Sequence, residues 1–180
     1  MITVIHGGQT GVDRGAHEAA LANGWLVAGY MPNDGRDERG PIPPHVACYL
    51  RPHTQQSYAA RTEANVRGSN AVLVVARDAD NPRATPGTAK TIDLATARRI
   101  RPQIVDPTSD VEAIASWLWR DVLLCRPLAL PLDPHARDPW PVRLMVAGPR
   151  ESKWAGAQAE TATLLRRVGA ALSKLEFTTP

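Results

Sequence analysis

Three glycine-bearing loops hold most of the residues in this sequence that suit the binding of an anion. The first covers residues 6–15 and reads HGGQTGVDRG, the second covers 84–91 and reads ATPGTAKT, and the third covers 147–153 and reads AGPRESK. Each loop follows an apolar β-type run and precedes a helical pattern. Helix N-termini present unpaired N–H groups and a partial positive charge, and glycine lets an oxyanion approach the backbone. These loops therefore predict a binding site for phosphate or another oxyanion.

The candidate ligand-binding residues in these loops are glycines, hydroxyl-bearing residues and charged residues. Arg150 suits bidentate contact with a phosphate, and Ser152 is also a candidate N-cap for the helix expected after it. Asp13 and Arg14 fit a structural role at the start of the first helix equally well. The loop residues taken as candidates are Gly7, Gly8, Gln9, Thr10, Gly11, Asp13, Arg14, Gly87, Thr88, Gly148, Arg150, Glu151 and Ser152.

Other kinds of site find little support in the sequence. The first loop is neither the dinucleotide fingerprint Gly-x-Gly-x-x-Gly nor the lysine-bearing phosphate loop of NTPases, so ATP hydrolysis is poorly supported. The five histidines have no metal-ligand spacing, and the two cysteines lie far apart, so we expect no metal site and no disulfide framework. No Ser-His-Asp or Cys-His arrangement is visible either.

Short apolar runs alternate with helical patterns along the chain. We expect strands at residues 2–5, 25–28, 47–50, 71–76, 103–105 and 142–147, and helices at 13–22, 57–67, 88–99, 110–124 and 154–175. This alternation is typical of βαβ units, so it predicts an α/β fold with a mainly parallel sheet and helices on both faces. In a parallel sheet every strand-to-helix loop lies at the carboxyl edge, so the three loops should meet there.

Length and composition limit the remaining possibilities. The 180 residues are 43% hydrophobic and carry a net charge of +3, which is typical of a globular chain and offers no basic stripe for nucleic acid. No apolar run approaches the roughly 18 residues of a membrane span, and no secretory signal follows Met1, so we expect a cytoplasmic protein that does not contact membranes. Residues 126–141 are rich in proline. We interpret them as a surface excursion within a single domain, 1–180, because one strand and one helix after them are too little for a second core.

The motifs resemble those of the molybdenum cofactor carrier family, which is similar to the YpsA-like and LOG-like Rossmannoid nucleotide-binding proteins. The matching segments are GGQTGVDRGA at 7–16, GPIP at 40–43, Tyr58 with RTEANV at 61–66, GT at 87–88 and AGPRES at 147–152. The resemblance implies a Rossmann-like, doubly wound fold, a homo-oligomer, and a phosphorylated pterin or nucleotide as ligand. It also adds Arg61 and Glu63 to the candidate site.

The sequence departs from this family at two places. Pro86 stands where the family usually has glycine, and proline removes one N–H from a phosphate cradle. The segment 126–141 is also longer and richer in proline than is usual in the family.

Our main hypothesis is a carrier of a phosphorylated heterocycle, with the molybdenum cofactor (molybdopterin) as first candidate and a nucleotide as second. Backbone amides at the three helix starts would hold the oxyanion, and Arg14, Arg61 and Arg150 would neutralise it. The pterin dithiolene would carry any molybdenum. The alternatives are a nucleotide-signal sensor and a LOG-like nucleoside-monophosphate N-glycosidic hydrolase. In the hydrolase Glu63 would act as the acid beside Arg61, although the chain lacks most of the LOG motif. Whether the protein is an enzyme stays open.

Overall fold

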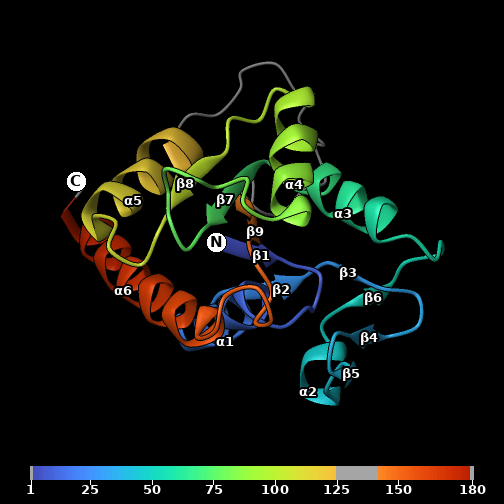
Figure 1. The fold of residues 1–180 in the computed structure, drawn as a ribbon. Coiled ribbons are helices and arrows are strands. Elements are labelled where there is room, and N and C mark those ends of the chain that lie inside the picture. Colours follow the sequence, from blue (N-terminus) through green and yellow to red (C-terminus); the bar gives the residue numbers. More distant parts are fainter. Residues whose placement is uncertain (1, 125–141, 179–180) are drawn as a thin grey trace, which may run out of the picture.

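A five-stranded parallel sheet forms the centre of the protein (Figure 1). The computed structural model describes residues 2–124 and 142–178, so the expected excursion at 126–141 lies outside the described residues. The strand order is β2-β1-β9-β7-β8, and every neighbouring pair is parallel. The strands are β1 (Ile2–Ile5), β2 (Leu26–Ala28), β7 (Ala71–Val75), β8 (Gln103–Val105) and β9 (Val142–Ala147). The predicted α/β class with a mainly parallel, Rossmann-like sheet is confirmed.

Helices cover both faces of this sheet (Figure 1). One face carries α1 (Val12–Ala22), α5 (Val111–Trp117) and α6 (Ala157–Thr178). The other face carries α3 (Tyr58–Arg67) and α4 (Pro86–Ala97). Because both faces are covered, β7 is apolar at every position, and β1 and β9 are apolar except at Thr3 and Arg143.

Side chains along each central strand alternate between two cores. Val4 and Leu73 belong to the larger core under α1, α5 and α6, whereas Ile5 and Val74 belong to the smaller core under α3 and α4. All four are essentially inaccessible to solvent. This alternation fixes the register of the strands, and with it the positions at which β1, β7 and β9 end and their loops begin.

The connections create a change of direction beside β9. The chain leaves β1 for α1 on one face of the sheet, and it leaves β7 for α4 on the opposite face. β9 lies between β1 and β7. Open α/β sheets bind ligands at such a point, outside the carboxyl ends of the strands. The topology thus places the candidate loops around one crevice.

A small lobe stands beside the sheet and contains the segment 30–52 (Figure 1). It consists of two short strand pairs and one helix: β3 (Tyr30–Met31) with β6 (Arg51–Pro52), β4 (Arg36–Asp37) with β5 (Gly40–Pro41), and α2 (Pro44–Ala47). The strand predicted at 47–50 is wrong. Pro44 at the first helical position favours the α2 turn, and the apolar Leu50 packs with Ile42 and Val46 instead of entering a sheet.

Two helices differ by three residues or more from their predicted bounds. The helix predicted at 110–124 is α-helical only to Trp117 and continues as the π-helix η1 (Leu118–Leu124). The last helix begins at Ala157, and the N-cap predicted at Ser152 is wrong. The carboxylate of Glu151 serves this helix start instead, because it accepts the N–H groups of Gly156 at 2.6 Å and Gln158 at 3.1 Å.

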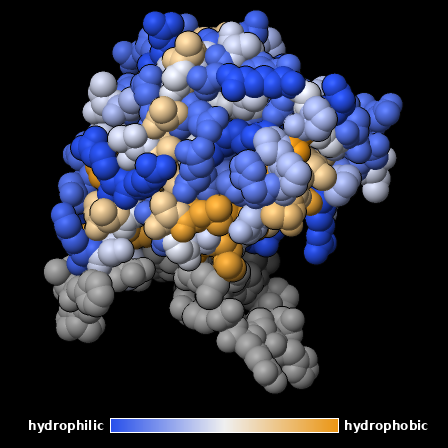
Figure 2. Space-filling model, turned by 90° about the horizontal axis from the view of Figure 1, so that it is seen from below, coloured by the Kyte–Doolittle hydropathy of each residue, from blue (hydrophilic) through white to orange (hydrophobic). Residues whose placement is uncertain are grey.

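The surface seen in Figure 2 is mostly hydrophilic, with apolar residues gathered near the middle of the view. Trp117 and Trp119 are partly buried against the larger core. None of the helices in the described residues combines the length and apolar character that crossing a membrane requires.

Candidate functional site

A cavity of about 370 Å³ lies at the carboxyl edge of the sheet, beside the ends of β1 and β9 and the start of α4. Its volume is in the usual range for small-molecule sites. Predicted site residues that line it are Gly7, Gln9, Asp13, Arg61, Gly87, Gly148 and Arg150. The lining also contains residues that the sequence analysis did not select, among them Thr62, Thr85, Thr91, Met145, Ala147 and Lys153.

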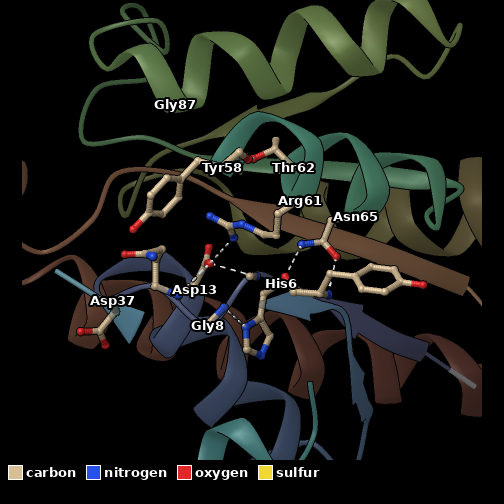
Figure 3. Close-up of polar contacts among 12 residues, drawn as sticks. His6, Gly8, Asp13, Asp37, Tyr58, Arg61, Thr62, Asn65 and Gly87 are labelled. Atoms are coloured by element: carbon tan, nitrogen blue, oxygen red, sulfur yellow. Dashed lines mark hydrogen bonds and ion pairs between the residues drawn. The ribbon is translucent and has the colours of Figure 1, made fainter. Parts of the chain in front are cut away.

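Arg61 reaches this cavity from α3 and lies directly against the first loop. A Cβ atom at Gly7 would come within 1.2 Å of Arg61 Nη1, so the guanidinium occupies the space that any side chain at position 7 would need. Figure 3 shows Arg61 between Tyr58 and Asp13, with its guanidinium 5.9 Å from the centre of the Tyr58 ring. Only 9% of Arg61 is exposed. Glycine at position 7 therefore leaves the space that the buried guanidinium of Arg61 occupies at the cavity wall.

Asp13 fastens the first loop to the start of α1 and faces Arg61 across the loop. Its Oδ2 accepts the N–H of Gly7 at 2.9 Å and the N–H of Gln9 at 3.1 Å, and Arg61 Nη1 is 3.8 Å away. Burial raises the pKa of Asp13, and the charge of Arg61 and the two N–H donors oppose this rise. Asp13 is the single carboxylate among the described residues that line the cavity.

Two lining residues carry buried polar atoms with no hydrogen-bond partner in the described structure. The unpaired atoms are the amide oxygen and nitrogen of Gln9 and the Nε of Arg61. Buried polar groups are normally hydrogen-bonded, so unpaired atoms beside a cavity mark unused capacity for polar contact. A ligand would need a small side-chain movement to reach them, because these atoms are covered in the present structure.

The N–H and hydroxyl donors of the first and third loops are largely taken by the chain's own carboxylates. Asp13 takes N–H groups of the first loop, and Glu151 takes those at the start of α6. The carboxylate of Glu38, in the turn between β4 and β5, accepts hydrogen bonds from the hydroxyls of Thr10 and Ser152. It also accepts the N–H of Ser152 at 3.0 Å. Thr10, Glu151 and Ser152 consequently do not line the cavity.

Arg14 is also engaged away from the cavity. Its Nη2 lies 2.5 Å from Asp37 Oδ2, and its Nε donates to the carbonyl of Gly8 at 3.1 Å. Asp37 thus neutralises the charge of Arg14. This ion pair does not support the role predicted for Arg14 in neutralising a ligand. Figure 3 places Asp37 beside the first loop.

Gly8 and Gly11 serve the turn rather than the cavity. Both have positive φ, 76° and 72° respectively, which favours glycine. A Cβ at Gly8 would meet Leu50 of the lobe at 2.8 Å, and one at Gly11 would meet the backbone of the third loop at Pro149 at 2.6 Å. A substitution at Gly8 would strain the backbone, so it cannot test ligand binding by itself.

The start of α4 also borders the cavity. Gly87 and Thr85 line it, and a Cβ at Gly87 would meet nothing within 4 Å. Thr88 is buried and belongs to the cap, because Thr85 is the N-cap and their hydroxyls lie 2.8 Å apart. Glu63 is exposed on α3 and does not line the cavity. The structure thus does not bring Glu63 together with the lining residues, whereas the neighbouring Thr62 lines the cavity.

The cavity wall carries more positive than negative charge. Arg61, Arg150 and Lys153 line it, against the single carboxylate of Asp13. The side chain of Arg150 is 46% exposed, so it can turn toward a ligand without losing buried contacts. An anionic group is the natural partner for this set of side chains.

The comparison with known proteins supplies the family. The model of the circularly permutated YpsA SLOG family matches residues 4–127. The chain belongs to this family. A crystal structure of a protein named "putative molybdenum carrier protein", from Syntrophus aciditrophicus SB, has a similar fold, with a TM-score of 0.73 and 24% identity over 93% of this chain and 94% of that one. The predicted relationship to YpsA-like proteins is confirmed, the solved structure shares the fold, and no curated protein matches the chain.

This YpsA SLOG protein also has a larger cavity, of about 570 Å³, at the amino ends of β7 and β8. Arg99, Arg101 and Trp117 line it, and none of the predicted site residues does. It lies at the edge of the sheet opposite to the strand-to-helix loops. The smaller cavity is the better candidate site because the glycine loops, the start of α4 and a buried arginine meet there.

The described histidines of this SLOG protein form no metal site. His6 Nδ1 accepts the N–H of Gly8 at 3.0 Å, and its Nε2 lies 3.2 Å from Nδ1 of His17. Burial, together with the neighbouring His17, lowers the pKa of His6 to about 3, so the ring is neutral and supports the first loop. Within residues 2–124 and 142–178, no group of three His, Cys, Asp or Glu side chains is arranged to hold a metal ion.

Proposed function

We propose that this protein binds and carries a small phosphorylated heterocycle in the 370 Å³ cavity, with the phosphate at the start of α4. The observation that carries the proposal is the meeting of Arg61, Arg150 and Lys153 with a helix N-terminus in one cavity. Helix N-termini and arginines are the groups that proteins most often direct at phosphate.

We infer the position of the phosphate from the hydrogen-bond donors that the protein's own carboxylates leave unoccupied. Asp13, Glu38 and Glu151 already accept several of the N–H and hydroxyl donors of the first and third loops. At α4 the N–H of Gly87 is among the first in the helix and has no acceptor within it. The space beside Gly87 is open. This refines the initial hypothesis: one helix start, rather than three, would receive the oxyanion.

Molybdopterin is our first candidate for the cargo, because it joins a phosphate to a polar heterocycle and the similar solved structure is named as a molybdenum carrier. The cations and the start of α4 fit the phosphate, and the unpaired amide of Gln9 fits the polar edge of a heterocycle. Any molybdenum would be coordinated by the dithiolene sulfurs of the pterin. A nucleotide offers the same two features.

Calorimetric titration with guanosine 5′-monophosphate (GMP) and with guanosine tests the proposal, since guanine shares the aminopyrimidinone ring of a pterin. We expect GMP to bind at least about tenfold more tightly, because a hydrogen bond to a charged group contributes about 1.5–3 kcal/mol. Arg150→Ala should remove most of this difference, whereas Arg99→Ala, in the other cavity, should not. Equal affinity for GMP and guanosine would contradict the proposal. Separately, mass spectrometry of small molecules released from the purified protein would identify the natural cargo.

One observation favours the hydrolase as a second candidate. The cavity holds a carboxyl group, Asp13, whose pKa is raised by burial, and a buried acid of this kind can protonate a leaving base. Asp13 rather than Glu63 would then be the acid. Incubation of the protein with GMP and measurement of free guanine distinguishes the two functions. A carrier releases none, whereas a hydrolase releases guanine, and Asp13→Asn would stop the release while GMP still binds.

A further inference from the structure

Glu38 lies in the lobe, outside the sheet and outside the cavity wall, yet its side chain is only 13% exposed. It occupies the turn between β4 and β5. Three donors from two different loops converge on its carboxylate. They are the hydroxyl of Thr10 after β1, and the N–H and the hydroxyl of Ser152 after β9. Thr10 in turn accepts the N–H of Glu151 at 3.2 Å. Glu38 therefore connects the first and third loops.

The same carboxylate also faces Arg150. Arg150 Nε lies 3.9 Å from Glu38 Oε2, while the Arg150 side chain borders the cavity and is half exposed. A free arginine loses rotamer entropy when a ligand immobilises it. A carboxylate that attracts the Nε end restricts the side chain beforehand and leaves the two terminal nitrogens for a bidentate contact.

The neighbouring acid in the turn provides a comparison. Asp37 pairs with Arg14, which donates to the carbonyl of Gly8. This contact attaches the same turn to the first loop but has no part in holding Arg150. Both acids thus anchor the lobe, but of the two only Glu38 pairs with a residue that lines the cavity.

We propose that Glu38 is a positioning residue of the ligand site: it holds Arg150 and the third loop in place so that Arg150 meets the anionic group of the ligand. The inference rests on the proposed function, because it assumes that Arg150 binds a phosphate. Glu38 does not touch the ligand. Its effect passes through Arg150.

A double-mutant cycle with GMP as the probe tests this inference. Glu38→Ala should weaken GMP binding by about tenfold when Arg150 is present, and by less than about twofold in the Arg150→Ala background, as expected for residues that act through one contact. Guanosine binding should change little. Glu38→Gln, which keeps an oxygen for Ser152 but loses the charge, should give an intermediate loss.

Asp37→Ala is the matched control, because it removes an acid from the same turn without touching Arg150. Its effect on GMP affinity should be the same with or without Arg150. If Glu38→Ala behaves in this way too, or strengthens GMP binding, Glu38 is only an anchor of the lobe and the inference is wrong. If the parent protein does not distinguish GMP from guanosine, the proposed function fails and the role of Glu38 fails with it. A melting curve for each variant shows that the comparison is made on folded protein.

Discussion

Gly7→Ala is the most informative single substitution, because one methyl group would displace Arg61 without altering any charge. The new Cβ would lie 1.2 Å from Arg61 Nη1 and 2.4 Å from its Cζ. The φ angle of Gly7 is not positive, so alanine can adopt the backbone conformation. The clashing atoms are at the end of a flexible side chain. We therefore expect a folded protein in which the guanidinium has moved.

The size of the effect follows from the distances. To reach ordinary contact with the methyl group, at about 3.4 Å, Nη1 must retreat by about 2 Å. A retreat directly away from Asp13 lengthens the 3.8 Å separation to about 6 Å. At an effective dielectric constant of about 20, the attraction falls from about 4.4 to about 2.8 kcal/mol. The free energy of unfolding should therefore decrease by roughly 1.5 kcal/mol, and the melting temperature by about 3–6 °C.

Ligand binding should suffer more than stability, because the cavity loses a cation at a fixed position. We expect GMP affinity to fall by about ten- to a hundredfold, equivalent to about 1.5–3 kcal/mol. Calorimetric titration measures this loss, and the same titration in the Arg61→Ala background is the control. With Arg61 already absent, Gly7→Ala should have almost no further effect on GMP binding.

Two results would refute this reasoning. Gly7→Ala could leave GMP affinity unchanged while Arg61→Ala lowers it, which would mean that Arg61 binds the ligand from a different position. Gly7→Ala could also lower affinity equally with and without Arg61. The added methyl would then obstruct the ligand itself, and Arg61 would not be the reason that position 7 is glycine.

The remaining predictions concern stability, pH and the exposed acid. The pKa of His6 is about 3 in the folded protein and 6.5 in the unfolded chain, so the unfolded chain binds more protons between these pH values. The free energy of unfolding should therefore fall by up to about 5 kcal/mol as the pH drops from 6.5 to 3. His6→Asn, which can keep the acceptor for Gly8, should flatten this slope in urea titrations. Gly148→Ala should lower the free energy of unfolding by about 3 kcal/mol or more, because the new Cβ would lie 2.1 Å from the carbonyl oxygen of Val75. Gly87→Ala is the control: its Cβ meets nothing within 4 Å, so the free energy of unfolding should change by less than about 1 kcal/mol. Glu63→Gln should leave GMP affinity unchanged, since Glu63 is exposed and outside the cavity.

The sheet was predictable because its central strands β1, β7 and β9 are buried on both faces and are therefore nearly continuously apolar. Val72 to Val75 have no exposed surface, and a short run rich in β-branched residues between turn residues favours a central strand. The carboxyl-edge position of the glycine loops followed from the parallel arrangement. The lobe was less predictable, because its elements are two to four residues long and depend on a small local core at Ile42, Val46 and Leu50.

The site was predictable in its loops but not in its long-range contacts. Sequence patterns indicate which residues could bind an anion, but they do not tell which donors the chain itself will occupy. Glu38 lies 28 residues after Thr10 and 114 residues before Ser152, and no local signal links these positions. The close approach of Arg61 to Gly7 also depends on the packing of α3 against the first loop.

Helical phase explains why α3 places Arg61 and Glu63 differently. Arg61 and Asn65 share a face, as their spacing predicts, and both are buried against the sheet side of the helix. Asn65 bonds to the N–H and the carbonyl of Tyr30, at 2.7 and 3.1 Å (Figure 3). Glu63 lies between them on the exposed side. A resemblance to family motifs selected Glu63, whereas the geometry of the helix selects Thr62.

The most direct measurement is a crystal structure of the protein soaked with GMP. The phosphate should lie beside the N–H of Gly87 and within hydrogen-bond distance of Arg61 or Arg150, with guanine in the 370 Å³ cavity. Phosphate density beside Arg99 and Arg101 in the larger cavity would contradict the proposed site. So would phosphate bound to Thr10 and Ser152 in place of Glu38, because the start of α4 would then not be the anion site.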